Sequence, residues 1–326
     1  MNATIIWGKR LLALSVCLSA LMFANAQKVT IDGLKYYLNA DNHEAIVDNG
    51  NRWSGELIIP SEVNHNGDTF TVKSICWAAF YDCHELTKVR LPKTVEVIDN
   101  RVFTDDSESG GAVSPVYKNP FKGCSALDAI EVDEDNPSMC SIGGVLFSKD
   151  GTELYSYPAG KKAETYVVPQ GVTWIGGAAF ASNRNLFSVE MSAMVTRICS
   201  QAFEDCSSLR LLDLPESVRI IESLSFHECN LESLIIRGLL DSQSVGSSLF
   251  SGLSKSTVIY TLRSQIDSFA NYFSGNIRSL EDYETVGMQT LLSTKGCYSL
   301  YNLQGRRIQN FAKGIYIRNG RKVVVK

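Results

Sequence analysis

The sequence has little of the material from which most catalytic and metal sites are built. It contains no Cys-x-x-Cys pair, no His-Glu-x-x-His, no glycine-rich phosphate loop and no Ser-His-Asp arrangement. Its acidic runs, Asp105-Asp106 and Asp133-Glu134-Asp135, lie in polar turns, which is typical of solvated loops. We therefore expect neither an enzyme nor a cofactor nor a metal site. The four histidines occupy unrelated positions: His43, His65, His84 and His227.

An excess of positive charge is also missing. The formal net charge is −4, and −6 once Lys9 and Arg10 are removed with a leader, which argues against a nucleic-acid partner. Residues 1–26 predict an export signal peptide, with that basic start, an apolar run and Ala24-Asn25-Ala26 before the cleavage point. No later apolar stretch is long enough to span a bilayer, so we expect an exported chain without a transmembrane segment.

A repeat of about 23 residues organises the middle of the chain. Its most visible mark is a phenylalanine, with Ile five residues and Val eight residues before most copies. A fixed period of this length indicates a solenoid, in which each unit buries its apolar face only against its neighbours. This fold favours a binding or scaffold role over catalysis. The phenylalanines in register are Phe80, Phe103, Phe121, Phe180, Phe203, Phe226 and Phe250.

The repeat around Phe203 predicts the local structure of one unit. Leu212 and Leu214 alternate with polar residues, which predicts a short strand that stacks with its equivalents into a parallel sheet. Pro215 ends the strand because proline cannot donate to a strand ladder. Ala202 and Phe203 predict a helical turn rather than a full helix. The expected fold class is a β-rich solenoid with a parallel sheet and short helical turns.

Departures from the period divide the rest of the chain. Asn66-Gly67, Asp150-Gly151 and Asn319-Gly320 each predict a hairpin turn between alternating arms. Ser264 to Phe273 has apolar residues at helical spacing, namely Ile266, Phe269, Ala270 and Phe273. The predicted parts are a signal peptide (1–26), an N-terminal β cap (27–75), repeats (76–262) with insertions at 105–119 and 144–158, a C-terminal cap (263–283), a linker (284–296) and a small β module (297–326).

The cysteines follow the repeat. The predicted mature chain has eight, and an even number in an exported protein is compatible with disulfides. However, four of them follow a repeat phenylalanine by three residues, and a column of this kind indicates small buried core residues. The buried thiol is our prediction, and a bridge between adjacent repeats at the last two stays open. The column is Cys83, Cys124, Cys206 and Cys229.

The outward strand positions are the candidate ligand-binding residues. In register, one column contains Arg90, Glu131, Glu190, Asp213 and Ile235. Three acids on neighbouring strands predict a negative stripe for a partner with basic or polar groups. An ordinary solvated face is the alternative. The neighbouring column is Lys88, Ala129, Ser188, Leu211 and Ser233.

Trp174 is the remaining candidate for the binding face. It stands where other repeats have Val97, Arg197 and Ile220, which indicates an exposed position suited to ligand contact. The alternative is packing against the predicted hairpin at Tyr155 and Tyr157. The candidate set is therefore Lys88, Arg90, Glu131, Glu190, Asp213 and Trp174.

The motif IxxIxxxAFxxCxxLxxLxLPxxVxxI over residues 53–262 resembles the BspA-like, or Treponema-type, leucine-rich repeat of bacterial surface proteins. Residues 53–60 look like the cap of such proteins from Bacteroidetes. Tyr301-Asn302-Leu303-Gln304-Gly305, with the hairpin that follows, is similar to the C-terminal sorting domain of type IX secretion substrates. The resemblance implies a cell-surface or secreted protein of a Gram-negative bacterium that binds protein or glycan ligands in adhesion. It implies no enzyme activity. A structural spacer is the alternative, and an enzyme with a site built from loops is disfavoured.

Overall fold

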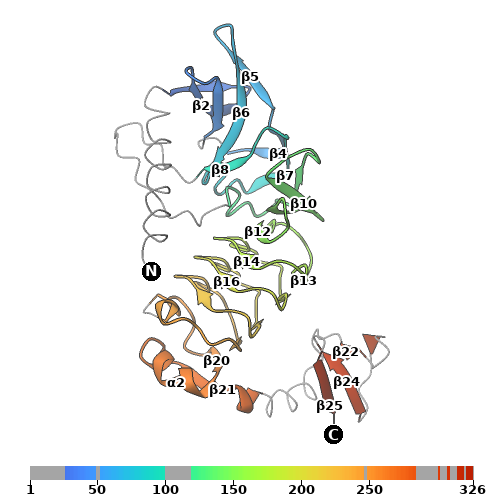
Figure 1. Cartoon of the computed structure of the whole chain (residues 1–326), viewed down its shortest axis with the longest axis vertical. Helices are drawn as coiled ribbons and strands as arrows, with labels where there is room; N and C mark the ends of the chain where they lie inside the picture. Colours follow the sequence, from blue (N-terminus) through green and yellow to red (C-terminus); the bar gives the residue numbers. More distant parts are fainter. Residues whose placement is uncertain are drawn as a thin grey trace, which may run out of the picture.

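The structure is a computed structural model of the chain (Figure 1). It describes residues 26–48, 52–99, 119–245 and 248–283, and within the C-terminal module residues 300–301, 307–308, 314–318 and 321–325. The predicted signal peptide up to residue 25, the predicted insertion up to residue 118 and the predicted linker 284–296 lie outside the described residues.

The N-terminal segment forms a six-stranded sheet in the order β1-β2-β3-β6-β5, with β8 paired to β6. Asn66 and Gly67 have positive φ angles of 53° and 95°, so the predicted hairpin turn joins β5 to β6. The parallel pairing of β6 with β8 connects this sheet to the repeats. Its strands are β1 (Gln27–Ile31), β2 (Leu34–Asn39), β3 (Glu44–Val47), β5 (Glu62–His65), β6 (Asp68–Cys76) and β8 (Val97–Asp99).

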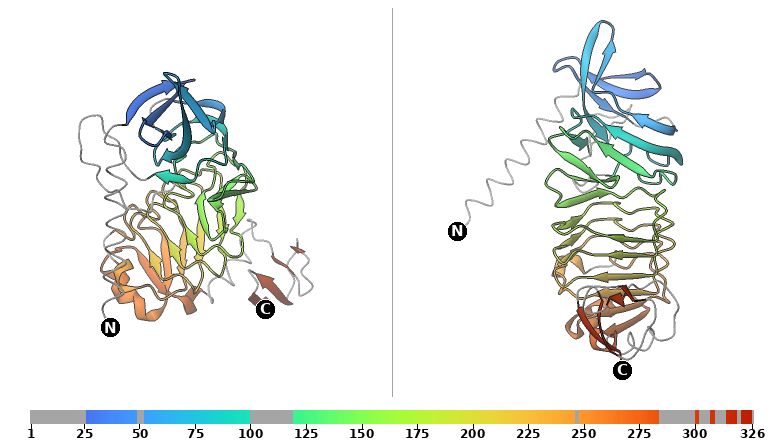
Figure 2. Two further views of the ribbon diagram at one scale, coloured as in Figure 1. Left: turned by 45° about the horizontal axis from the view of Figure 1, so that its top comes forward. Right: turned by 90° about the vertical axis from the view of Figure 1, so that its right-hand side faces the viewer.

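The predicted parallel strands of the repeats form two separate sheets, β4-β7-β9 and β13-β15-β17-β19-β20-β21. Val189 pairs with Leu212 and Leu212 with Leu234, and β17 ends at Leu214, before Pro215, as predicted. Successive repeats stack along the long axis of the molecule (Figure 2). The strands are β4 (Ser54–Ile58), β7 (Glu85–Leu91), β9 (Ala129–Val132), β13 (Thr165–Val167), β15 (Ser188–Glu190), β17 (Leu211–Leu214), β19 (Ser233–Ile236), β20 (Val258–Thr261) and β21 (Asn276–Ser279).

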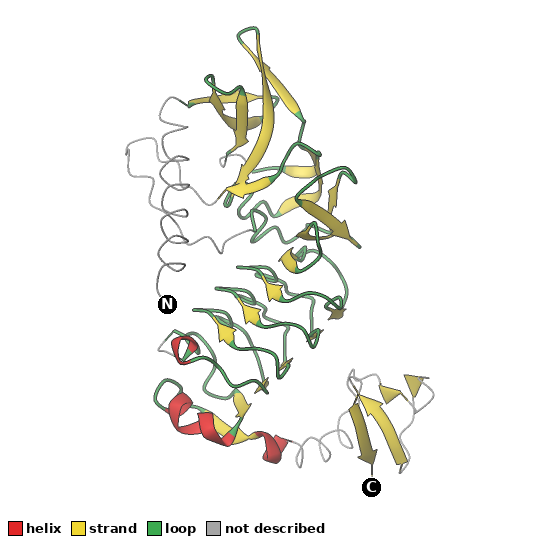
Figure 3. Cartoon of the chain, viewed as in Figure 1, coloured by secondary structure: helices red, strands yellow, loops and turns green. Residues whose placement is uncertain are grey.

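A further six-stranded sheet lies on the return path of the repeats, in the order β10-β11-β12-β14-β16-β18 (Figure 3). The predicted hairpin is confirmed as β11 and β12, with Gly151 at a φ of 72°. It is more than an insertion, because β12 pairs in parallel with β14 and begins the stack of return strands. The strands are β10 (Met139–Ile142), β11 (Val145–Ser148), β12 (Glu153–Ser156), β14 (Trp174–Ile175), β16 (Arg197–Ile198) and β18 (Ile220–Ile221).

The turns around the repeat phenylalanines carry their own hydrogen-bond ladder. Gln201 and Asp205 have φ angles of 59° and 54°, so this segment alternates in handedness and is not the helical turn that the sequence predicts. The backbone N–H groups of Gln201, Phe203 and Asp205 donate to carbonyls of the next repeat at 3.2, 2.9 and 2.9 Å. The ladder satisfies these backbone groups without helix, and it aligns successive phenylalanines. The Phe180 and Phe203 rings stack 4.9 Å apart, fully buried.

The cysteine column adds a second donor to the phenylalanine carbonyls, which already accept a backbone N–H from three residues later, as the Phe203 carbonyl does from the Cys206 N–H at 3.2 Å. The Cys206 thiol donates to the Phe180 carbonyl oxygen over 3.1 Å, and the Cys229 thiol donates to that of Phe203 over 2.8 Å. A carbonyl oxygen can accept two hydrogen bonds, and the thiol supplies the second donor in the space of a small apolar side chain. Cys140 is half-buried. The prediction of buried thiols is confirmed for Cys76, Cys83, Cys124, Cys199, Cys206 and Cys229.

The repeats end at a short helix, α2 (Arg263–Ala270), inside the segment where the sequence predicts one. Phe269 and Phe273 are buried as expected. The prediction for Ala270 is wrong, because this residue is exposed and Gln265 is buried in its place. The Gln265 amide accepts from the Leu240 N–H at 2.8 Å and donates to the Gly238 carbonyl at 2.9 Å, so a polar side chain fastens the helix to the preceding repeat.

A short 3₁₀ turn, η1 (Ser242–Ser244), precedes this helix. The C-terminal module has the predicted antiparallel hairpin, in which β24 pairs with β25. Among the described residues, no helix is long and apolar enough to cross a membrane. The module's strands are β22 (Leu300–Tyr301), β23 (Arg307–Ile308), β24 (Gly314–Arg318) and β25 (Arg321–Val325).

We predict that Phe203→Ala lowers the free energy of unfolding by about 3–5 kcal/mol, because it leaves a cavity in the centre of the phenylalanine stack. Urea denaturation followed by circular dichroism measures this change. Met194→Ala is the matched control, since Met194 is 51% exposed and its truncation should change stability by less than about 0.5 kcal/mol. Equal effects of the two substitutions would contradict the stacked core.

We also predict that the seven described cysteines remain thiols in protein exported and purified without reductant. Alkylation in denaturant, followed by peptide mass spectrometry, counts them. Recovery of a Cys206–Cys229 disulfide would show that the open alternative is right and that the thiol-to-carbonyl bonds are absent from the exported protein.

Candidate binding face

The structure divides the predicted outward column into two parts. Glu190 and Asp213 are register partners on β15 and β17, as predicted. Glu131 is not their neighbour, because β9 belongs to the other sheet and β13 places Val167 opposite Glu190. The prediction of a continuous column from Glu131 to Glu190 is therefore wrong.

The β10–β11 hairpin causes this division. The Ile130 N–H on β9 donates to the Gly144 carbonyl over 2.9 Å, and the Ser141 hydroxyl donates to the Ile130 carbonyl over 2.6 Å. The hairpin thus occupies the edge of β9 that would otherwise continue the sheet. The Lys161 ammonium holds the hairpin turn by donating to the Gly143 carbonyl at 3.0 Å and to the Asp128 carbonyl at 3.1 Å.

The prediction of a negative stripe is also wrong for the β4-β7-β9 sheet, where the acids are paired with basic residues. Glu131 pairs with Lys88 at 2.6 Å and with Arg90 at 3.3 Å, and Arg90 pairs with Glu56 at 2.6 Å. Two acids and two bases balance within this network, so Glu131 does not extend a stripe of unpaired negative charge. The hydrogen bond from Lys88 lowers the pKa of Glu131. The sequence pattern missed Glu56 because β4 precedes the first repeat.

On β17 the second acid is also neutralised. Asp213 accepts a two-pronged ion pair from Arg237, with Nε–Oδ1 and Nη2–Oδ2 distances of 2.6 and 2.8 Å. The Arg237 guanidinium lies 5.8 Å from the Tyr283 ring, which packs 4.9 Å from the ring of Tyr260. Ile235, predicted to face outward, is fully buried. The chain itself thus covers the C-terminal part of the face. Tyr283 lies outside the repeat pattern, so periodicity could not predict its place on this face.

What remains accessible is a smaller area over β13, β15 and β17, which we call the open patch. Val167 is 60% exposed, and Glu190 is exposed with no ion pair among the described residues. The patch is bounded on one side by the ion pairs of the β4-β7-β9 sheet and on the other by the Asp213–Arg237 pair. The open patch consists of Thr165, Val167, Ser188, Glu190 and Leu211.

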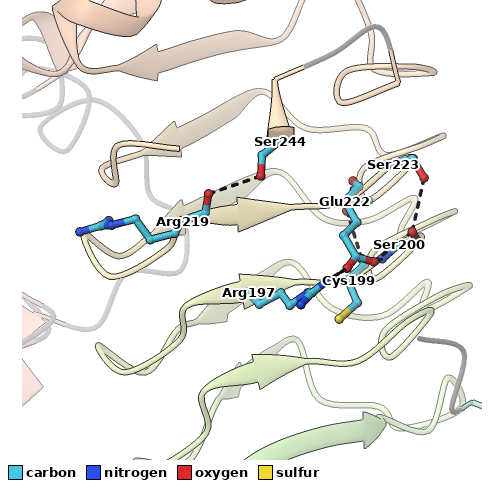
Figure 4. A network of polar contacts seen from close by, with 8 residues as sticks. Arg197, Cys199, Ser200, Arg219, Glu222, Ser223 and Ser244 are labelled. Carbon is cyan, nitrogen blue, oxygen red and sulfur yellow. Dashed lines mark hydrogen bonds and ion pairs between the residues drawn. The ribbon is translucent and has the colours of Figure 1, made fainter. Parts of the chain in front are cut away.

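Trp174 does not belong to this face. Its strand β14 lies in the sheet of return strands, where Trp174 pairs in register with Glu153 and Arg197. The Arg197 guanidinium lies 5.0 Å from the Trp174 ring and bonds to Glu222, whose carboxylate also accepts from the Ser200 N–H at 2.9 Å (Figure 4). Trp174 is 39% exposed, so the exposure is as predicted and the placement with the other candidates is wrong.

Comparison with protein families gives a match over residues 66–162 and 173–294, in six copies, to the family described as the BspA type leucine-rich repeat region. The chain belongs to the BspA-type leucine-rich repeat family. The repeat fold follows from this membership, as does a general role in protein interaction. A search of curated proteins gave no match.

Several solved structures are similar to this leucine-rich repeat chain. The pneumococcal vaccine antigen PcpA is 18% identical, with a TM-score of 0.40 over 78% of this chain and 98% of its own. A leucine-rich cell surface protein from Faecalibacterium prausnitzii is 20% identical, with a TM-score of 0.38 over 74% and 97%. A leucine-rich repeat protein from Bacteroides ovatus is 17% identical, with a TM-score of 0.34 over 77% and 67%.

The ion pair of Lys88 with Glu131 predicts a pH dependence. The folded-state pKa of Glu131 lies below its ordinary value of 4.5, so the pair stabilises the fold above that pH and is lost as pH falls through the lowered pKa. Replacing Lys88→Met should raise the pKa of Glu131, and Lys88→Arg should leave it low. Carbon-detected NMR titration of the Glu131 carboxyl group measures both. Identical midpoints in wild type and Lys88→Met would contradict the pairing.

Proposed function

We propose that this chain is an exported protein of the bacterial cell surface that binds another protein through the open patch. The observation that carries the proposal is the accessibility of Val167 and Glu190 on a face that is otherwise neutralised by ion pairs or covered by the chain. An exposed aliphatic side chain next to an unpaired acid provides apolar contact and charge recognition together.

The other parts of the chain support this role. We propose that the β1–β6 segment caps the first repeat and α2 caps the last, so that a solenoid of about 23-residue units presents its strand face between them. The export signal at residues 1–26 and the sorting-like C-terminal module would deliver the chain to the surface of a Gram-negative bacterium.

A protein suits the open patch better than a glycan does. Sugar rings stack on exposed aromatic faces, and the patch has none. Trp174, the exposed tryptophan of the repeats, lies on the sheet of return strands with a guanidinium near its ring. The patch instead offers a valine, short hydroxyl side chains and one carboxylate, which fit a polypeptide with a basic residue.

We expect Glu190→Lys to weaken binding of the full mature chain at least tenfold, because it places a like charge against the basic group of the partner. The measurement is surface plasmon resonance on a panel of purified extracellular-matrix proteins, with binding to whole bacterial cells as a second format. Glu134→Lys is the matched control, since Glu134 is an exposed acid that does not belong to the open patch. Unchanged binding by Glu190→Lys would exclude the patch.

A further inference from the structure

The open patch contains a strand edge as well as a face. Among the described strands, β13 pairs with β15 alone. The Glu164 carbonyl accepts from the Phe187 and Ser188 N–H groups at 2.7 and 3.2 Å, and the Val168 N–H donates to the Glu190 carbonyl at 2.9 Å. Backbone groups alternate in direction along a strand, so those of residues 164, 166 and 168 face β15. The backbone groups of Thr165 and Val167 therefore face away from it, toward the break between the two sheets.

The strand on the far side of this break does not use these groups. The edge of β9 that does not pair with β7 bonds instead to the β10–β11 hairpin, through the Ile130 N–H and carbonyl. At the last return strand, β18, the carbonyl of the preceding residue Arg219 accepts from the Asp241 N–H at 2.8 Å, so a following segment bonds beside that edge. The β13 edge differs from both in having no such bond among the described residues.

The side chains of β13 leave this edge unprotected. Natural edge strands are usually guarded by charged residues, proline or a bulge. Lys162 and Glu164 precede the strand and Pro169 follows it, but Thr165, Tyr166 and Val167 are uncharged and carry a backbone N–H each. Thr165 and Val167 are exposed, and Tyr166 is half-buried with its ring 4.7 Å from that of Tyr157.

We propose that an extended segment of the partner protein adds to the free edge of β13 as a strand, with an apolar side chain beside Val167 and a basic one reaching Glu190. This inference rests on the proposed function and specifies the partner chemistry. Glu190 lies one strand beyond Val167, so a residue on the added strand would be about 10 Å from it, a distance that an arginine side chain spans. Backbone bonds would supply affinity, and Val167 with Glu190 would supply selectivity.

The test uses proline to remove one N–H from the edge. Thr165→Pro removes a donor that faces away from β15, so the existing sheet keeps its bonds. Thr165→Ala removes the side chain and keeps the N–H. A linear seven-residue peptide library displayed on phage is selected on the full mature chain, and enriched peptides are measured by isothermal titration calorimetry. Thermal unfolding shows whether each variant is folded.

We expect enriched peptides with alternating apolar residues and a basic residue, bound about tenfold more weakly by Thr165→Pro and within twofold of wild type by Thr165→Ala. Hydrogen exchange of the Thr165 and Val167 amides should slow on peptide binding. Absence of any enriched peptide, or equal binding by Thr165→Pro, would overturn the strand addition.

Two further outcomes separate this inference from the proposed function. If Glu190→Lys abolishes binding of a matrix protein while Thr165→Pro leaves it intact, the face binds its partner without the edge. If sedimentation shows that the free chain dimerises and Thr165→Pro makes it monomeric, a second copy occupies the edge and the proposed occupant is wrong.

Discussion

The alternating turn at each repeat phenylalanine is the constraint on which the rest of the structure depends. Because residues such as Gln201 and Asp205 adopt positive φ, every second N–H of the turn points to the next repeat and finds a carbonyl there. The spacing of this ladder aligns Phe180, Phe203 and Phe226 into a continuous stack. The phenylalanine carbonyls accept a backbone N–H within their own turn, and the cysteine thiol of the next repeat donates to them as well. One backbone geometry thus accounts for the two columns most visible in the sequence.

The break between β9 and β13 determines where the chain can recognise a partner. A regular array would bury both edges and leave a uniform face. Here the β10–β11 hairpin ends one sheet, and Thr165 to Val167 begin the next with an edge that pairs with no other described strand. At the other end, Tyr283 and Arg237 cover the face that the repeats leave open. The accessible area is confined to the strands between these two features, so irregular segments define the recognition surface of a regular fold.

The repeat core was predictable because each buried position recurs in register. Val218, Ile221 and Phe226 follow from periodicity alone, and the stacked copies bury them as expected. The charge of the outer face was not predictable in this way. An outward acid such as Asp213 is neutralised by Arg237, 24 residues later, and Glu131 by Lys88, 43 residues earlier. Ion pairing depends on which side chains meet across neighbouring strands. A column that takes one residue from each repeat leaves out the basic residues beside the acids, so it cannot predict their neutralisation.

Four features could be predicted from the amino-acid sequence: the repeat fold, the buried cysteine column, the hairpins at Asn66-Gly67 and Asp150-Gly151, and the pairing of Glu190 with Asp213 on neighbouring strands. Those features depend on local propensity and on a period, both of which can be read along the chain. Three features could be seen only in the folded chain: Trp174 lies on the sheet of return strands, the strand face divides at β9, and β13 pairs with β15 alone among the described strands. The strand edge that a hairpin occupies is set by hydrogen bonds between the hairpin and the repeats. The repeat period contains no information about these bonds, because the hairpin is not part of it.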